Sequence, residues 1–132
     1  MKGFKKFIFY WLPPIGWMMF IFSLSSQTRV SLTHQVVSDF IFFKSLHMLE
    51  YAVLYGLLFR ALYQIDNKIM SLKNKFILPI IIGFIYSFTD ELHQLFVPTR
   101  SGQLRDTGFD LLGILLMYTL IKRYLKQLKK YL

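Results

Sequence analysis

Residues 76–94 read FILPIIIGFIYSFTDELHQ. The apolar run 76–88 leads almost directly into Asp90 and Glu91, and His93 follows two residues later. Asp106 and Asp110 then stand at the start of a second apolar run. Ionisable groups inside or at the edge of a bilayer are costly, so they usually mark a working site. The segment therefore predicts a membrane-spanning helix with a functional polar cluster at its end.

Composition points to a membrane rather than to water as the solvent of this chain. The 132 residues are 55% hydrophobic, and their mean hydropathy is +0.43. A soluble domain of this size cannot bury so much apolar surface. The absence of cysteine excludes disulfides, zinc-thiolate sites and thiol nucleophiles. The length predicts a single domain over residues 1–132.

Four apolar stretches approach the roughly 20 residues that a helix needs to cross a bilayer. They cover about residues 7–24, 40–62, 76–96 and 107–125. Pro13 and Pro14 lie inside the first stretch and predict a kink or a shortened regular part there. We therefore expect an all-α fold, an integral membrane four-helix bundle.

The basic residues are distributed unevenly between the two sides of these predicted spans. Twelve of the 16 fall on one side, where Asp66 is the only acid; they are Lys2, Lys5, Lys6, Arg60, Lys68, Lys73, Lys75, Lys122, Arg123, Lys126, Lys129 and Lys130. By the positive-inside rule, both termini are expected in the cytoplasm. The net charge of +9 then reflects topology and contact of the basic C-terminal tail with anionic lipid, rather than nucleic-acid binding.

Three of the predicted helices carry a polar stripe at the outer end of the bundle. The stripes are Lys44, His47, Glu50 and Tyr51; then Asp90, His93 and Gln94, with Glu91 about 100° away; and then Asp106, Asp110 and Gly113. In lipid, such stripes must face one another. Gly113 is small enough to let another helix approach. Arg100, on the loop after Pro98, is expected to fold over the cluster and to contact a carboxylate or phosphate.

The same residues resemble a known family, the VanZ-like membrane proteins. Residues 90–100, DELHQLFVPTR, resemble its core motif together with Asp106, Asp110 and Gly113. The resemblance extends to residues 22–27 and to Lys44, His47, Tyr51 and Arg60. Two positions depart from the pattern, because many members have Asn in place of Asp110 and the usual Gly is replaced by Thr99. The resemblance implies a multi-pass protein of the bacterial plasma membrane, and the family's namesake is linked to low-level teicoplanin resistance.

The leading hypothesis is that the outward-facing cluster binds an amphiphile of the outer leaflet and modifies it by acid–base hydrolysis or group transfer. The candidates are a lipid-linked wall precursor, a phospholipid and a lipoglycopeptide. Close carboxyl groups in a medium of low dielectric constant titrate apart, so one can serve as acid and another as base. The expected catalytic residues are Asp90, Glu91, His93, His47 and Asp106. The expected binding residues are Lys44, Arg100, Tyr51, Gln94 and Asp110. No cofactor is expected, since no P-loop or dinucleotide fingerprint occurs.

Several alternatives are left open by the sequence, as is the oligomeric state. The cluster can be an ion-pair network in a non-catalytic scaffold or binding factor. It can also belong to an oligomeric proton- or ion-coupled transporter, although four short helices are few for one. His47-x-x-Glu50 has the ligand types of a metal centre, but this motif is short and common. Hydroxyl groups near the cluster are expected to bond backbone carbonyls within a helix or to cap a turn rather than to act as nucleophiles; they belong to Ser87, Thr89, Thr99 and Ser101.

Overall fold

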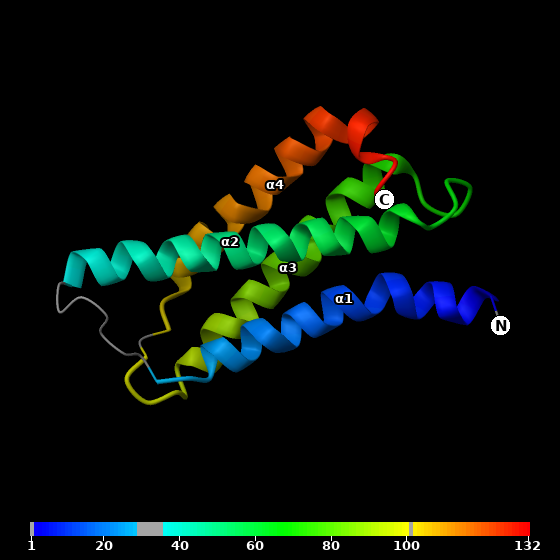
Figure 1. The fold of residues 1–132 in the computed structure, drawn as a ribbon. Helices are drawn as coiled ribbons and strands as arrows, with labels where there is room; N and C mark the ends of the chain where they lie inside the picture. The colour runs from blue at the N-terminus through cyan, green and yellow to red at the C-terminus, as the bar shows by residue number, and fades with distance from the viewer. Residues whose placement is uncertain (1, 29–35, 101) are drawn as a thin grey trace.

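The computed structural model describes residues 2–28, 36–100 and 102–132. Within these ranges all regular secondary structure is helical and no strand forms, as the sequence predicts. Figure 1 shows the helices α1 (Lys2–Ser25), α2 (Val36–Tyr63), α3 (Leu72–Gln94) and α4 (Thr107–Leu128), with the short 3-10 helix η1 (Leu104–Asp106) before α4. The four expected apolar stretches fall one to a helix. The exception is residues 95 and 96, which lie beyond the end of α3.

The two termini and the α2–α3 loop lie together at one end of the molecule, here called the terminal end (Figure 1). The Gln64 side-chain amide donates a 2.5 Å hydrogen bond to the backbone carbonyl of Leu132. The Arg60 guanidinium lies 4.9 Å and 4.7 Å from the ring centres of Phe9 and Tyr10. The opposite end, here called the polar end, contains the last turns of α1 and α3, the first half of α2 and the start of α4 (Figure 1).

Helix α2 provides most of the buried core. Its buried apolar side chains recur along one face and pack against α1 and α4; the core cluster is Ile21, Tyr51, Leu54, Tyr55, Leu58, Phe59, Ile114 and Ile121. The contact between α2 and α4 is the most extensive in the molecule. It includes Gly113, where an added Cβ would overlap the backbone carbonyl of Met48. The predicted close approach of another helix at Gly113 is therefore confirmed.

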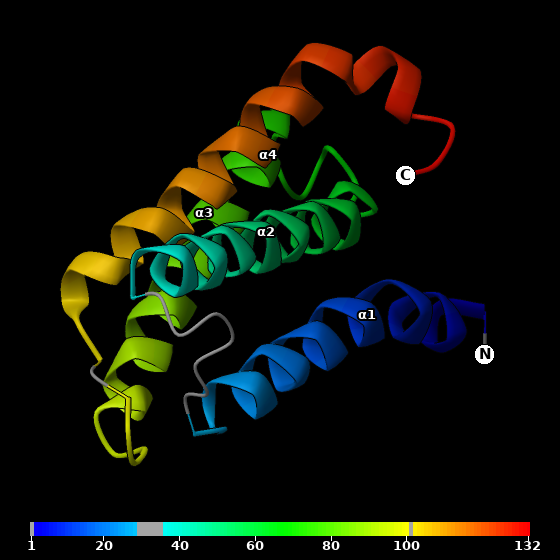
Figure 2. The same cartoon turned by 60° about the vertical axis from the view of Figure 1, so that its left-hand side comes forward.

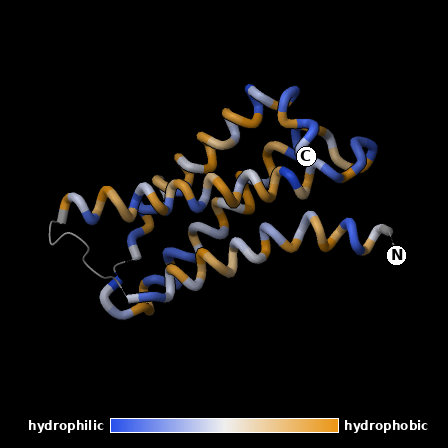
Figure 3. The backbone as a smooth tube through the Cα atoms, in the orientation of Figure 1, coloured by the Kyte–Doolittle hydropathy of each residue, from blue (hydrophilic) through white to orange (hydrophobic). Residues whose placement is uncertain are grey.

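Among the residues that the structure describes, three helices are long and apolar enough to cross a membrane, over Gly3–Ser25, Val37–Tyr63 and Leu72–Gln94. Helix α1 is the least covered of them, since only 11% of its apolar window is buried. Large apolar side chains such as Phe7 and Met19 are exposed on it. Figure 3 shows apolar residues along the helices and hydrophilic residues gathered toward the ends of the molecule. Such a surface suits hydrocarbon rather than water.

Helix α4 is not among these three although it has 22 residues, so its composition does not support a fourth crossing at 107–125. Asp110 at one end and Lys122 at the other confine its uninterrupted apolar run to residues 111–121. At 1.5 Å per residue this run spans about 16 Å, against a hydrocarbon core of about 30 Å. The helix nevertheless leads the chain from the polar end back to the terminal end (Figure 1).

Two helices change direction along their length. Helix α1 continues through Pro13 and Pro14, and its axis bends in its first half in both views (Figures 1 and 2). The proline ring clashes with the carbonyl four residues earlier, which accounts for the predicted kink. Helix α4 has a non-helical residue at Tyr124, with φ −106° and ψ 15°. The chain beyond it turns back, so that Leu125 and Leu128 pack against the core.

Candidate functional site

The polar end of α2 meets the start of α4 through an ion pair and an imidazole–carboxylate contact. Lys44 forms an ion pair with Asp106, and each of these side chains is only 12% exposed. One helical turn further along α2, His47 Nδ1 lies 3.6 Å from Asp110 Oδ1. The same nitrogen lies 3.9 Å from Glu50 Oε2. The i, i+3 spacing of these residues on α2 therefore places a cation and an imidazole against two successive carboxylates.

Helix α3 joins this group through a hydroxyl. Ser87 donates a 2.6 Å hydrogen bond to Asp110 Oδ2, and both residues are buried. The expectation that Ser87 bonds a backbone carbonyl is thus wrong, because a buried carboxylate on α4 faces it. Thr89 follows that expectation, since its hydroxyl donates to the carbonyl of Tyr86 at 2.8 Å. Ser101 lies outside the described residues.

Asp90 connects α3 to α1 rather than to α4. Its Oδ2 accepts hydrogen bonds from the Ser25 hydroxyl at 2.8 Å and from the Gln94 amide at 3.1 Å. His93 Nε2 lies 3.0 Å from the Ser26 hydroxyl. Sequence reasoning assigned no role to either serine. One feature of the sequence could have pointed to them. The two serines directly follow the apolar stretch of α1, and they belong to the segment 22–27 that resembles the family.

The loop after α3 folds back on the helix ends at the polar end. The backbone N–H of Gln103 donates to Glu91 Oε2 at 2.9 Å. A Cβ at Gly102 would overlap the backbone carbonyl of Glu91, so only glycine fits there without a shift. Thr99 takes a positive φ of 67°, a conformation that usually selects glycine. The loop therefore covers the Glu91 carboxylate closely.

Arg100 on this loop reaches the end of α1. Its Nε donates to the carbonyl of Gln27 at 2.8 Å, and its Nη2 donates to the carbonyl of Leu24 at 2.9 Å. The last carbonyls of a helix have no partner within the helix. Arg100 supplies donors to this end of α1 and thereby ties α1 to the α3–α4 loop.

Tyr51 lies between the two halves of the cluster. Its side chain is fully buried on α2, and its hydroxyl has no hydrogen-bond partner among the described residues. Both Asp90 and Asp110 lie within electrostatic range of that hydroxyl. Asp90 Oδ1 likewise has no hydrogen-bond partner among the residues that the structure describes. Because buried polar atoms are almost always paired, these two oxygens are candidate contacts for a ligand.

The predicted site residues thus form three adjoining groups at the polar end. Lys44, His47, Asp106 and Asp110 meet at the α2–α4 contact; Asp90, His93 and Gln94 meet α1; Glu91 and Arg100 belong to the loop contacts. Their catalytic and binding roles remain predictions. In the described parts of the chain, no three His, Asp or Glu side chains are grouped so that they could hold a metal ion.

These features define a class: a helical membrane protein with several candidate spans and a buried polar cluster at one end. The chain belongs to the VanZ/LLP1 family, whose model matches residues 7–126. This confirms the resemblance drawn from the sequence, and the matched range includes every predicted site residue. No curated protein and no solved structure matches the chain.

Proposed function

We propose that this chain is a protein of the bacterial plasma membrane whose polar cluster binds an outer-leaflet amphiphile and modifies it by acid–base chemistry. The observation that carries the proposal is the position of His47 between the carboxylates of Glu50 and Asp110. Its family name also links the chain to glycopeptide resistance, which makes the lipoglycopeptide teicoplanin a first candidate substrate. Lipid-linked wall precursors and phospholipids are the other candidates.

The proposed chemistry starts at the imidazole. A carboxylate facing Nδ1 favours the tautomer with its proton on that nitrogen, so Nε2 carries the lone pair that accepts a proton. An attacking water or hydroxyl would transfer its proton to His47 and would thereby become a stronger nucleophile. A protonated carboxyl in the cluster, such as Asp90 or Glu91, would return a proton to the leaving group. The His47–carboxylate distances exceed hydrogen-bonding distance, and catalytic contacts often tighten only when substrate binds.

Substrate binding is proposed to use the cations and the unpaired polar atoms of the cluster. Lys44 and Arg100 contact an internal carboxylate and the α1 carbonyls, respectively. A phosphate or carboxylate on the amphiphile would compete for these donors. The Tyr51 hydroxyl and Asp90 Oδ1 would complete their hydrogen bonding with the polar part of the ligand. The exposed apolar faces of the helices suit its hydrocarbon part.

The test is to incubate purified protein with membrane lipid extract and with teicoplanin and to follow the masses of both. We expect a new mass in one of them, and a rate reduced by about 10²–10⁴-fold in His47→Gln. Ser45→Ala is the matched control on the same helix, because its exposed hydroxyl bonds only the local carbonyl of Ile41 in the described structure. Unchanged lipids and drug, without measurable binding of either, would refute the proposal.

A second candidate function is a non-catalytic membrane factor that sequesters or excludes the drug. The observation in its favour is that many cluster members bond one another or the backbone, as the Lys44–Asp106 pair and Arg100 do. In that case Asp90→Asn and Glu91→Gln should lower melting temperature and resistance in parallel. Catalysis instead predicts lost function at unchanged melting temperature, so measuring both quantities on the same variants separates the two candidates.

Both candidate functions assume the same topology, in which the two termini lie in the cytoplasm and α4 is a fourth membrane crossing. The supporting observations are the basic residues gathered at the terminal end and the Gln64–Leu132 hydrogen bond, which brings the C-terminus back to that end. The polar cluster would then face the outer leaflet, away from cytosolic nucleotides.

A further inference from the structure

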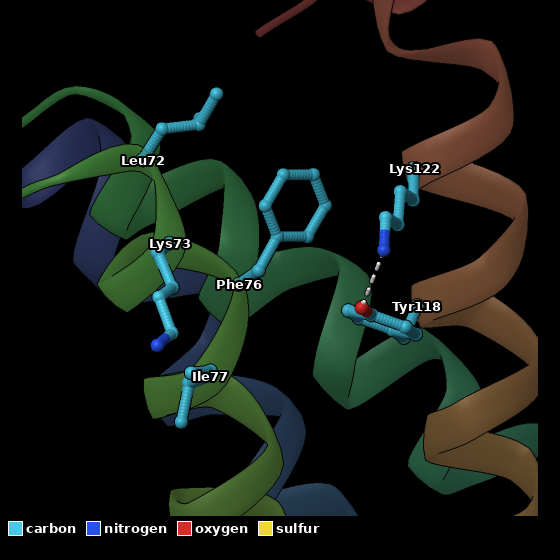
Figure 4. Close-up of a pocket in the computed structure, with 6 residues that line it drawn as sticks. All are labelled: Leu72, Lys73, Phe76, Ile77, Tyr118 and Lys122. Carbon is cyan, nitrogen blue, oxygen red and sulfur yellow. Dashed lines mark hydrogen bonds between the residues drawn. The ribbon is translucent and has the colours of Figure 1, made fainter.

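A groove of about 420 Å³ lies at the terminal end, between the start of α3 and the last turns of α4. It is remote from the polar cluster. Six residues line it: Leu72, Lys73, Phe76, Ile77, Tyr118 and Lys122. Figure 4 shows the Phe76 ring standing between the two helices, with Lys122 and Tyr118 facing it from α4. A volume of roughly 300–1,000 Å³ is usual for small-molecule sites, so the groove has room for a headgroup and part of a chain.

The groove combines an apolar floor with cations. Lys122 Nζ donates a 3.1 Å hydrogen bond to the Tyr118 hydroxyl on the α4 wall. Lys73 belongs to the α3 wall, and both lysines are exposed. None of the six described lining residues is acidic. Asp66, the one acid of the neighbouring loop, accepts a hydrogen bond from the backbone N–H of Lys68. The groove therefore favours an anion.

The position of the groove along α3 and α4 indicates which kind of anion it would bind. Leu72 begins the candidate span of α3, and Lys122 follows the apolar run of α4. Under the proposed topology, these positions place both lysines near the level of lipid phosphates, while Ile77 lies about one turn further along α3 toward the hydrocarbon. A free phosphate would use only the cations. A second helix in the groove would bury both ammonium groups without a partner.

We propose that this groove binds one anionic phospholipid, with its phosphate held by Lys122 and Lys73 and an acyl chain lying along Phe76 and Ile77. This site is independent of the polar cluster at the opposite end. It also differs from a general attraction of the basic C-terminal tail to the membrane surface, because it requires the particular side chains of the groove.

The experiment is native mass spectrometry of the full chain in detergent, titrated with dioleoyl phosphatidylglycerol, dioleoyl phosphatidylcholine or inorganic phosphate. We expect a single phosphatidylglycerol molecule to be retained in preference to phosphatidylcholine, and inorganic phosphate to give no retained adduct. The double variant Lys73→Gln/Lys122→Gln should bind phosphatidylglycerol about thirtyfold more weakly, at about 1 kcal/mol per lysine.

Two further variants make the result decisive. Lys129→Gln/Lys130→Gln removes the same charge from the same end but outside the groove, and should retain the parent affinity. Ile77→Trp fills the half-exposed floor while keeping both lysines, and should lose the lipid. Equal binding of the two lipids, retention of inorganic phosphate alone, equal loss in the Lys129/Lys130 control, or unchanged binding by Ile77→Trp would each overturn the proposal.

Discussion

The two oxygens of Asp110 face different helices. Oδ2 accepts from Ser87 on α3, and Oδ1 faces His47 on α2. In Asp90, Oδ2 receives two donors; among the described residues, Asp90 Oδ1 and Asp110 Oδ1 both have no hydrogen-bond partner. Loss of a hydrogen-bond donor to a buried carboxylate lowers the stability of the fold, because water does not replace the lost donor. At the scale of single residues, the hydroxyl donors therefore hold the cluster in place.

Replacement of Ser25 by alanine tests this dependence. Ser25→Ala removes one of two donors to the buried Asp90 carboxylate, so we expect the free energy of unfolding to fall by about 1–3 kcal/mol. The measurement is thermal or denaturant unfolding in detergent micelles. Ser45→Ala removes an exposed hydroxyl on α2 and should change the same quantity by less than about 0.5 kcal/mol. Equal effects of the two substitutions would contradict a specific role for the Ser25–Asp90 bond.

Helix α2 is the central element, because its buried face forms the core and its polar end forms part of the site. The aromatic residues Tyr51, Tyr55 and Phe59 recur every four residues and remain buried. The same face presents His47 and Lys44 to α4 one and two turns earlier. The crossing of α2 and α4 therefore determines both the packing and the alignment of the charged contacts.

The crossing depends on the missing side chain at Gly113. A Cβ there would overlap the carbonyl of Met48, so Gly113→Ala must move α2 and α4 apart. We expect a loss of about 1–3 kcal/mol in unfolding free energy and, under the proposed function, reduced activity as well. Gly108→Ala on the same helix is the matched control, since a Cβ at Gly108 meets nothing within 4 Å. That control should be neutral or stabilising by up to about 1 kcal/mol. A Gly113→Ala protein as stable as the parent would exclude the close crossing.

The whole molecule separates a basic end from a polar end that contains the carboxylate cluster. The termini and the α2–α3 loop share the terminal end, and the end of α3 and the start of α4 lie at the other (Figure 1). The acidic residues Asp90, Glu91 and Asp110 belong to these two helix ends. Helix α4 completes this arrangement although its apolar run is short. Because it packs on α2 over much of its length, protein contacts cover part of its surface and less of it needs to match the hydrocarbon.

The absence of cysteine allows the topology to be tested directly with single-cysteine variants. Under the proposed orientation, Leu104→Cys at the polar end should react with a membrane-impermeant maleimide in intact cells. Lys68→Cys in the α2–α3 loop should react only after permeabilisation. The reverse pattern would contradict the orientation. Tyr131 is exposed after the end of α4, so a Tyr131→Cys variant reports on this helix. Labelling of Tyr131→Cys in intact cells, as expected for Leu104→Cys, would mean that α4 does not cross.

Much of this architecture follows from the linear sequence for simple reasons. Apolar runs predict the helices, and helical periodicity assigns Lys44, His47 and Tyr51 to one face of α2. A small residue at position 113 predicts a close crossing. Each inference concerns a property local to one helix, and each agrees with the structure. Whether α4 crosses the membrane was less predictable. Its apolar run is short, so crossing depends on how the neighbouring helices cover it.

The sequence alone determined the helical class, the family, and which residues share a face of each helix. Only the tertiary structure decided which helix each face meets. It paired Asp90 with Ser25 of α1, joined Ser87 to Asp110, and directed Arg100 to the carbonyls that end α1. The physical reason is that the 3.6-residue period orients a side chain about its own helix axis. The partner it meets depends on packing between helices that lie far apart in the sequence.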